Sequence, residues 1–317
     1  MPAQAIPSEL AAFRLRPADR LSTAHKNTLM AELQDIPRPP RSLQKLVSSE
    51  YLSQATSAEL SELVMDEPLV AAKVLATVNT PFYGLQNPVS SIGQAMIFLG
   101  LNSVRSICLK YMMETSFQAS SPELKKIYDD IWCASAFACE LCLKVAQKLQ
   151  WTDQGTLVTQ VVLSFIGRLA TASLLPEATV RTIASQGLLE RAQAEQKALG
   201  LGASEIGGLV LKEWALPDSL VADVRAIDLV LTEPAPSPCS EAQTRLALCY
   251  LCARLGEQLA MGQRADLSSF DPMQEGGPEF YHFASYWPGH QLTNLMNSLR
   301  SPEIQKSIQQ MKASLRT

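Results

Sequence analysis

Residues 66–85, DEPLVAAKVLATVNTPFYGL, carry the strongest signal for the fold of this chain. Pro68 suits the first turn of a helix, where no backbone donor is needed, and Asp66 lies near the expected cap. Apolar side chains then recur every three or four residues, at Leu69, Ala72, Val74, Leu75 and Val78. This spacing predicts a helix with one buried face, which ends at Asn79-Thr-Pro.

The same helical period continues along most of the chain. We predict further helices over residues 22–33, 40–47, 57–65, 91–98, 101–113, 121–149, 156–175, 188–199, 204–214, 217–231 and 241–259, and a terminal helix or pair over 290–315. No convincing stretch alternates between apolar and polar residues as a half-buried strand does. The predicted fold class is therefore all-α, a bundle of many helices.

Composition excludes several classes of protein. The chain has 317 residues, a formal charge of −4, and 47% hydrophobic against 18% charged residues, as an ordinary globular protein has. Its 27 basic and 31 acidic residues predict no strongly basic surface, which argues against nucleic acid as a partner. The only histidines are His25, His282 and His290, and this low number argues against a metal site built from several imidazole ligands.

The sequence also indicates a cytoplasmic protein. Residues 1–20 contain no apolar core of a secretory signal. The stretch from Val74 to Val104 carries no charge, but its prolines and glycines prevent a continuous membrane helix, so we expect no membrane partner. Seven cysteines, an odd number in a long chain, are typical of reduced thiols.

One linker divides the chain. The segment Glu233-Pro-Ala-Pro-Ser-Pro238 alternates prolines, which forbid a helix and favour an extended spacer. We expect an N-terminal helical extension over residues 1–35, a main domain over 36–233 and a C-terminal helical extension over 234–317 that packs on the bundle.

Motifs between residues 36 and 231 resemble, in their order and spacing, those of the HDOD domain family. Besides the stretch quoted first, they are Pro88-Val-Ser-Ser-Ile92, Leu99-Gly100, Trp132, Ile166-Gly-Arg-Leu169, Gly200 to Gly207 and Trp214-Ala-Leu-Pro217. The family is a bacterial signalling module related to HD-type metal-dependent phosphohydrolases. The resemblance implies an HD-like helical bundle, here with additional C-terminal helices, that regulates other signalling proteins.

The resemblance also implies where a related hydrolase would hold metal. HD-type enzymes bind metal through scattered histidines and a His-Asp pair, and the corresponding positions of this chain are Ala134, Ser164, Phe165, Ala203, Ile227 and Asp228. Alanine, phenylalanine and isoleucine side chains have no lone pair for a cation, and one aspartate cannot build the site. We therefore predict no catalytic residue, no metal and no cofactor.

Two C-x-x-C pairs, Cys139-Glu-Leu-Cys142 and Cys249-Tyr-Leu-Cys252, are the remaining metal-binding signal. Each pair falls inside a predicted helix that lacks the turn residues of a zinc knuckle. Residues three apart share a helix face, so we expect these thiols to pack in the core as small apolar groups. Stoichiometric zinc in the purified protein would contradict this expectation.

Asn79, Phe82, Tyr83 and Arg105 stand out as an interaction or structural motif of the N-terminal half. We expect Asn79 to bond backbone groups at its helix end, and we favour internal packing of Phe82 and Tyr83 over contact with a partner. Arg105 is the first charge after the uncharged stretch. It is either an exposed contact or the partner in a structural ion pair.

Six aromatic residues are concentrated near the C-terminus: Phe270, Phe280, Tyr281, Phe283, Tyr286 and Trp287. Aromatic residues are common at binding hot spots, so Tyr281 and Trp287 are candidates for a docking surface. The favoured alternative is that this loop plugs the bundle and ties down the terminal helices.

Three functions remain as alternatives. The leading one is a non-catalytic regulatory module that binds other signalling proteins on a degenerate HD-type scaffold. The second is a divergent metal-dependent phosphohydrolase with unexpected carboxylate ligands, and the third is a sensor that holds a nucleotide-like ligand without turning it over. No P-loop, G-x-S-x-G or H-E-x-x-H motif supports another enzyme class.

Overall fold

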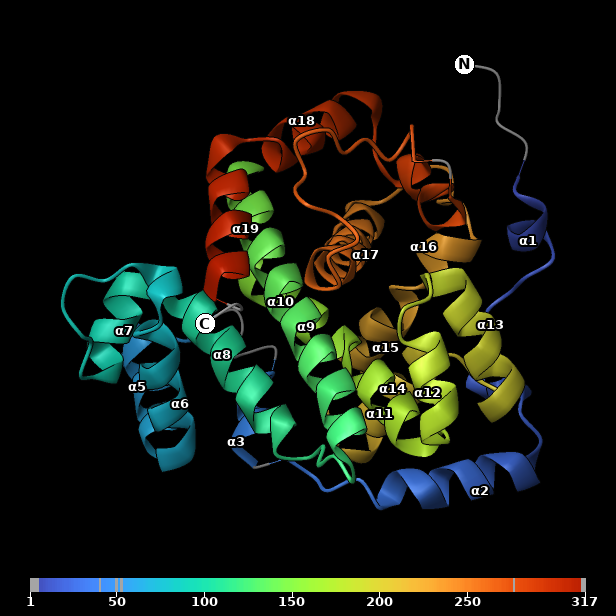
Figure 1. The fold of residues 1–317 in the computed structure, drawn as a ribbon, viewed down its shortest axis with the longest axis horizontal. Helices are drawn as coiled ribbons and strands as arrows, with labels where there is room; N and C mark the ends of the chain where they lie inside the picture. Colours follow the sequence, from blue (N-terminus) through green and yellow to red (C-terminus); the bar gives the residue numbers. More distant parts are fainter. Residues whose placement is uncertain (1–5, 40, 49–50, 52–53, 276, 315–317) are drawn as a thin grey trace.

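The computed structural model describes residues 6–39, 41–48, 51, 54–275 and 277–314, and within these residues it contains helices, turns and loops but no strand (Figure 1). The predicted all-α fold is therefore confirmed. The α-helices are α1 (Ser8–Ala11), α2 (Thr23–Gln34), α3 (Arg41–Leu46), α5 (Ser57–Met65), α6 (Pro68–Val78), α7 (Ile92–Leu99), α8 (Leu101–Glu114), α9 (Pro122–Lys148), α10 (Gln154–Ser164), α11 (Ile166–Leu174), α12 (Glu177–Ile183), α13 (Leu188–Leu199), α14 (Ala203–Glu213), α15 (Asp218–Ala226), α16 (Leu229–Thr232), α17 (Glu241–Ala260), α18 (Gly289–Leu299) and α19 (Pro302–Ser314). Short 3-10 turns are η1 (Ala18–Arg20), η2 (Pro81–Tyr83), η3 (Pro278–Phe280) and η4 (Phe283–Tyr286).

Helices α5 to α8 form a lobe at one side of the molecule (Figure 1). Thr56 and Glu59 start α5 with a capping box, in which each side chain accepts a hydrogen bond from the backbone N–H of the other residue, at 3.3 and 2.7 Å. The buried face of α6 consists of Val70, Val74 and Val78. Gly100 has a φ of 78° and separates α7 from α8, which are bent by 119° relative to each other.

The 27-residue helix α9 is the longest described helix and lies at the centre of the bundle (Figure 1). Neighbouring residues determine where α9 begins. The Ser121 hydroxyl accepts a hydrogen bond from the Leu124 N–H at 3.0 Å, and Pro122 lacks only a backbone donor that the first helical position does not use. Helix α17 packs along α9, and a Cβ added to Gly256 would lie 2.6 Å from the carbonyl oxygen of Ala134. Only glycine allows this close approach.

Most predicted helices agree with the observed ones to within one or two residues, and α5 spans Ser57–Met65 as predicted. The helix predicted over 156–175 is wrong in one respect: it breaks at Phe165 into α10 and α11, and the break brings Gly167 against the backbone of Ala203 in α14. The helix predicted over 217–231 likewise breaks, between α15 and α16.

Smaller differences concern helix starts. Helix α12 was not predicted, although it begins directly after Pro176. Asp66 lies near the cap of α6 as predicted, the N-cap itself being Glu67, and no side chain makes a cap hydrogen bond there. Pro40, with which another predicted helix begins, lies outside the described residues.

Residues Gln154–Leu174, which form α10 and α11, are long and apolar enough to cross a membrane by length and composition. However, 83% of their apolar window is buried inside the molecule. The bent pair α7 and α8 passes the same test only if it is counted as one span. Helices α10 and α11 are therefore buried to the extent that is typical of helices in a protein core.

Both ends of the described chain pack on the bundle. Near the N-terminus, the Ala18 N–H donates to the Glu205 carboxylate at 2.9 Å, and α2 lies against α14. Near the C-terminus, α19 lies along α9, where the Ser307 hydroxyl donates to Glu140 at 2.7 Å (Figure 1). One continuous hydrophobic core therefore includes residues from Leu10 to Ile308.

Candidate functional site

The positions at which the resemblance implies metal ligands present mainly apolar groups, and four of the six are buried. Ala134 of α9 is fully buried where Gly256 of α17 approaches it. Phe165, between α10 and α11, is 1% exposed, and Ala203, the first residue of α14, lies against Gly167 of α11. Ile227 is buried as well, while Ser164 and Asp228 are half-buried.

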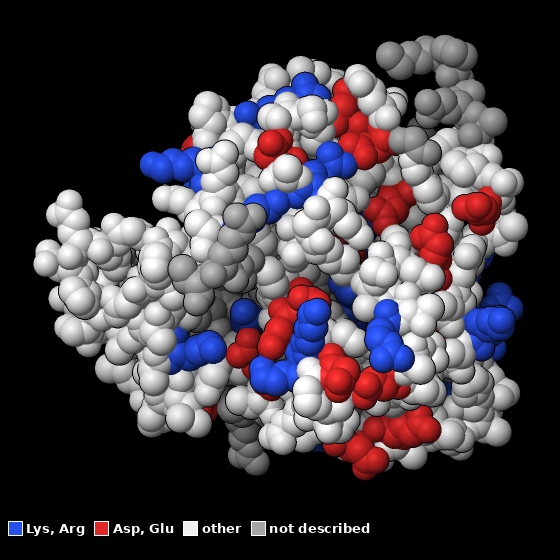
Figure 2. Space-filling model, in the orientation of Figure 1, with Lys and Arg blue, Asp and Glu red and all other residues white. Residues whose placement is uncertain are grey.

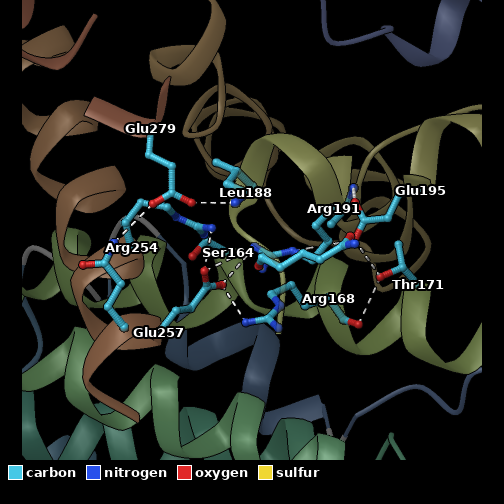
Figure 3. Close-up of polar contacts among 12 residues, drawn as sticks. Ser164, Arg168, Thr171, Leu188, Arg191, Glu195, Arg254, Glu257 and Glu279 are labelled. Atoms are coloured by element: carbon cyan, nitrogen blue, oxygen red, sulfur yellow. Dashed lines mark hydrogen bonds and ion pairs between the residues drawn. The ribbon is translucent and has the colours of Figure 1, made fainter. Parts of the chain in front are cut away.

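Five charged side chains lie beside several of these positions, and we name them the arginine–glutamate cluster: Arg168 of α11, Arg191 and Glu195 of α13, and Arg254 and Glu257 of α17 (Figure 3). Each of the five is buried. The Glu257 carboxylate accepts hydrogen bonds from all three guanidinium groups, at 2.6 Å from Arg168, 3.2 Å from Arg191 and 2.7 Å from Arg254. One carboxylate therefore ties three helices together.

The buried charges of the cluster shift one another's pKa values. Burial alone would raise the pKa of Glu257, but the three guanidinium groups lower that pKa to about 2. Burial and the neighbouring Arg191 lower the pKa of Arg168 to about 10. Burial also acts to lower the pKa of Arg254, but Glu257 outweighs it and the pKa is raised. Arg168, Arg254 and Glu257 are therefore charged at neutral pH.

Glu195 is the second acid of the cluster. Its carboxylate accepts from the Ala203 N–H at 2.8 Å and from the Thr171 hydroxyl at 3.4 Å, and it lies 4.0 Å from Arg191 Nε. Burial raises the pKa of Glu195. The cluster thus contains three guanidinium groups, one firmly ionised carboxylate, that of Glu257, and one carboxylate, that of Glu195, whose ionisation burial disfavours.

A divalent metal does not fit this region. Among the implied ligand positions, only Ser164 and Asp228 carry side-chain oxygens. Guanidinium groups offer no lone pair and would repel a cation. Within the described part of the chain, no group of three or more His, Cys, Asp or Glu side chains is arranged to hold a metal ion.

Sequence reasoning missed the arginine–glutamate cluster. Its signal was present, because Arg168 lies in the motif Ile166-Gly-Arg-Leu169, and Arg254 and Glu257 follow the apolar run from Leu246 to Ala253 within one predicted helix. A charge within an apolar stripe needs a buried partner. The partner could not be assigned, since Glu257 is 89 residues from Arg168 and 66 from Arg191.

Asn79 closes the loop that follows α6, which we name the η2 loop (residues 79–89). Its Nδ2 donates to the carbonyls of Leu75 and Val89, both at 2.8 Å, and its Oδ1 accepts from the Val89 N–H at 2.7 Å. The predicted backbone hydrogen bond at the helix end is confirmed. The same side chain also fixes the far end of the loop.

Phe82 and Tyr83 lie at the centre of the η2 loop and are half-buried. Their ring centroids are 4.6 Å apart in an edge-to-face arrangement. The η2 turn packs against α19, the last helix of the chain (Figure 1). The loop is therefore packed against its own chain, with part of both rings accessible.

Arg105 is only 1% exposed, so it is not an exposed contact. Its Nη2 donates to the Tyr51 carbonyl at 3.3 Å, and its guanidinium lies 5.9 Å from the centroid of the Tyr51 ring. Within the described part of the chain, it pairs with no carboxylate, and its Nε has no hydrogen-bond partner. Its role here is to hold Tyr51 against α8.

The aromatic residues near the C-terminus are mostly internal. Phe270, Phe280, Phe283, Tyr286 and Trp287 are buried, and Tyr281 is half-buried. The Trp287 ring stacks on Trp151 with centroids 5.9 Å apart and planes 8° from parallel. The Tyr286 hydroxyl donates to the Glu233 carbonyl at 3.0 Å, which holds the linker. Internal packing, the favoured alternative, therefore accounts for Trp287.

The two C-x-x-C pairs lie on α9 and α17, which pack against each other. All four thiols, Cys139, Cys142, Cys249 and Cys252, are at most 8% exposed, and burial raises the pKa of Cys139 to about 12. The Cys249 Sγ donates to Gln160 Oε1 at 3.6 Å. The predicted packing of these thiols in the core is confirmed.

Comparisons with known proteins agree with this architecture. The sequence model of the HDOD domain matches residues 36–229, more than half of the chain. An HDOD domain protein of unknown function from Geobacter sulfurreducens has a similar structure, with a TM-score of 0.61 and 14% identity over 89% of this chain and 96% of that chain. No curated protein is a significant match.

Two other solved structures have the same fold at low identity. A candidate signal transduction protein from Marinobacter aquaeolei VT8 has a TM-score of 0.60 and 18% identity, covering 98% of this chain and 64% of that chain. A candidate phosphohydrolase from Shewanella amazonensis SB2B has a TM-score of 0.56 and 17% identity, covering 90% of this chain and 97% of that chain.

Proposed function

Because this chain belongs to the HDOD domain family, we propose that it is a non-catalytic regulatory module that acts by binding other signalling proteins. The observation that supports this proposal is the arginine–glutamate cluster, in which Glu257 accepts hydrogen bonds from three guanidinium groups. It stands where the resemblance implies metal ligands. A region that holds metal in related enzymes serves here to join helices.

The size of the space around the cluster supports the same proposal. The cavity next to Arg168, Arg191 and Glu195 has a volume of only about 20 Å³. A space of this size holds one water molecule. A phosphate ester would not enter it without separation of α11 from α13.

Binding of a protein partner is supported by exposed apolar side chains on helices α5 to α7 of the lobe. Met65, Leu69, Ile97 and Phe98 are 58, 70, 83 and 60% exposed. Figure 2 shows that this lobe is nearly free of charged side chains on the face drawn. Large exposed apolar surface marks interaction sites. We propose that this lobe binds an uncharged, apolar surface of another protein, because such a partner buries no unpaired charge.

Hydrolysis assays test the non-catalytic part of the proposal. The purified protein is incubated with phosphodiester and phosphomonoester substrates in the presence of Mg²⁺ or Mn²⁺. We expect no turnover above the protein-free control. Metal-dependent hydrolysis that disappears with EDTA would instead support the alternative, a divergent phosphohydrolase with non-standard ligands.

Affinity capture from the native cell tests the binding part. The bait is the wild-type chain, with Ile97→Asp as the test variant and Met273→Asp as the matched control, since Met273 is another exposed apolar residue, at 46%, on a different part of the chain. We expect a specific protein to be retained by wild type and Met273→Asp and lost with Ile97→Asp. Equal retention by both variants would contradict the assignment to this lobe.

We also propose that the protein acts in the cytoplasm. All seven cysteines are free thiols, and four of them are fully or almost fully buried in the packing of α9 and α17. Unpaired cysteines in this number are typical of a reducing compartment. Fractionation of the native cell followed by immunodetection tests the location, and recovery in a membrane or extracellular fraction would contradict it.

A further inference from the structure

A cleft separate from the arginine–glutamate cluster lies between the lobe and the centre of the bundle. It has a volume of about 300 Å³ and is formed by α6 and α8 on one side and α9 and α10 on the other. The η2 loop and α19 complete its wall, through Phe82, Tyr83 and Met311. This volume is at the lower end of the range for small-molecule sites in proteins.

The floor of the cleft is apolar. Phe137, Leu143, Val158 and Val162 line it and are at most 9% exposed. Ile107 and Met311 add further apolar surface at its sides. A ligand that fills this floor must therefore present an apolar or aromatic body, since a polar group there would lose its hydration without compensation.

The wall carries hydroxyl groups that are free to bind a ligand. Thr77, Tyr83, Ser103 and Tyr111 line the cleft, and within the described part of the chain their hydroxyl groups make no hydrogen bond to protein. A tyrosine hydroxyl is protonated at neutral pH, and burial raises the pKa of Tyr83 further. These groups can each donate a hydrogen bond to polar atoms of a bound molecule.

The charges at the cleft leave one positive charge in excess. Lys73 and Lys110 both line it, and they share one carboxylate: Glu114 lies 3.9 Å from the Lys73 Nζ and 3.6 Å from the Lys110 Nζ. The Lys73 Nζ also lies 5.7 Å from the centroid of the Tyr111 ring. The other carboxylate of the lining, Glu140, accepts from Ser307 and pairs with Lys144 at 3.5 Å, so it is already compensated.

We propose that this cleft binds a small amphipathic organic anion, with its apolar or aromatic body on the floor and a single carboxylate, sulfonate or phosphate beside the ammonium groups of Lys73 and Lys110, which share Glu114. The uncompensated ammonium charge sets the anionic group, and the enclosed apolar floor sets the body. The free hydroxyl groups of Tyr83 and Tyr111 provide further contacts between the two. This site is independent of the partner surface proposed above, because Ile97 and Phe98 are not part of its lining.

Titration with the aromatic sulfonate 1-anilinonaphthalene-8-sulfonate, followed by fluorescence, tests the proposal with the full chain. We expect saturable 1:1 binding that Lys110→Met weakens by about fivefold, as expected for the loss of one partly exposed charge contact. Lys125→Met is the matched control, since Lys125 is an exposed lysine that pairs with Asp129 away from the cleft. Ser103→Trp, which fills the cleft, should abolish binding, and circular dichroism confirms that each variant is folded.

Ile97→Asp separates the cleft from the exposed apolar lobe, since it should leave binding of the probe unchanged. Probe binding that survives Lys110→Met and Ser103→Trp but is lost with Ile97→Asp would overturn the proposal. Competition then defines the class of ligand. Displacement by decanoate or by adenosine monophosphate supports an organic anion with an aliphatic or an aromatic body, respectively. Displacement by neither, or equal displacement by decanol and decanoate, would overturn it.

Discussion

Glu257 is the residue on which three buried guanidinium groups depend, at distances between 2.6 and 3.2 Å. We expect Glu257→Ala to lower the free energy of unfolding by about 3–5 kcal/mol, because removal of one partner leaves uncompensated charges in the core. Asp129→Ala is the control: Asp129 pairs with Lys125 at 3.0 Å, but both side chains are more than 60% exposed, so its loss should cost less than about 1 kcal/mol. Urea unfolding followed by circular dichroism measures both, and equal effects would contradict a structural role for the cluster.

The depressed pKa of Glu257 has a consequence for acid stability. Burial opposes ionisation, but the three guanidinium groups lower this pKa from 4.5 to about 2 in the folded state. A carboxyl group with a lowered folded pKa contributes stability above its unfolded pKa and loses that contribution as the pH falls through the folded value. Wild type should therefore lose stability between pH 4.5 and 2 more steeply than Glu257→Gln, by an amount on the order of 3 kcal/mol.

Glu195 provides the internal control for that measurement. Burial raises its pKa, so its contribution to stability is present at low pH and is lost as the pH rises through the folded value. Glu195→Gln should therefore relieve a cost at neutral pH and leave the steep loss at acid pH unchanged. If both variants change the acid slope equally, Glu257 is not the group responsible.

Asn79 makes three hydrogen bonds to backbone groups of Leu75 and Val89, all between 2.7 and 2.8 Å. We expect Asn79→Ala to lower the free energy of unfolding by about 1–3 kcal/mol, since the partly buried backbone groups of Val89 lose their partner. Asn87→Ala is the matched control within the same loop, because Asn87 is exposed. Chemical denaturation distinguishes them, and a neutral Asn79→Ala would show that the loop closes without this side chain.

At the scale of elements, two glycines inside helices should respond to the same substitution in opposite directions. A Cβ on Gly256 would lie 2.6 Å from the Ala134 carbonyl oxygen and 2.8 Å from Ala138 Cβ, so Gly256→Ala must push α17 away from α9. A Cβ on Gly93, in α7, meets nothing within 4 Å. We expect Gly256→Ala to destabilise the protein by about 1–3 kcal/mol and Gly93→Ala to stabilise it by about 0.5–1 kcal/mol, measured by thermal unfolding.

Helix limits were predictable from sequence wherever neighbouring residues set them. Ser121 and Pro122 start α9 through a hydroxyl and a missing donor, both local features. Helix α12 follows Pro176 with Glu177 in its first turn, which is the same kind of signal and could have been used. The break at Phe165 was not predictable, because its context is the approach of α11 to α14, which are distant in sequence.

At the scale of the whole molecule, the candidate site also combines features that single residues predict with features that only the fold brings together. The absence of imidazole ligands could be inferred from single positions such as Ala134 and Phe165, because their chemistry does not depend on the fold. The arginine–glutamate cluster could not, since it joins α11, α13 and α17 from three separate parts of the chain. Likewise, the cleft at Tyr83 could not be predicted from sequence, because α19 packs against the η2 loop from the far end of the chain.

The dependence of the bundle on its C-terminal helices leads to a prediction for truncated chains. Residues 1–233 lack α17 and therefore Glu257, so Arg168 and Arg191 would keep their buried positions without their main carboxylate. The face of α9 that carries Ala134 and Ala138 would also lose its covering helix. We expect this chain not to form a folded monomer, because uncompensated charge and exposed core would together exceed the marginal stability of a domain.

Residues 1–300 are the control for this truncation, since they lack only α19 and the end of the chain. They lose the buried side chains of Ile304 and Ile308 but keep α17 and the arginine–glutamate cluster intact. Size-exclusion chromatography and thermal unfolding should therefore show a folded monomer with a lower Tm for residues 1–300, and aggregated or unfolded protein for residues 1–233. A cooperative unfolding transition of monomeric 1–233 would mean that the matched region from residue 36 to 229 folds without α17, and that the cluster adds stability to an already complete domain.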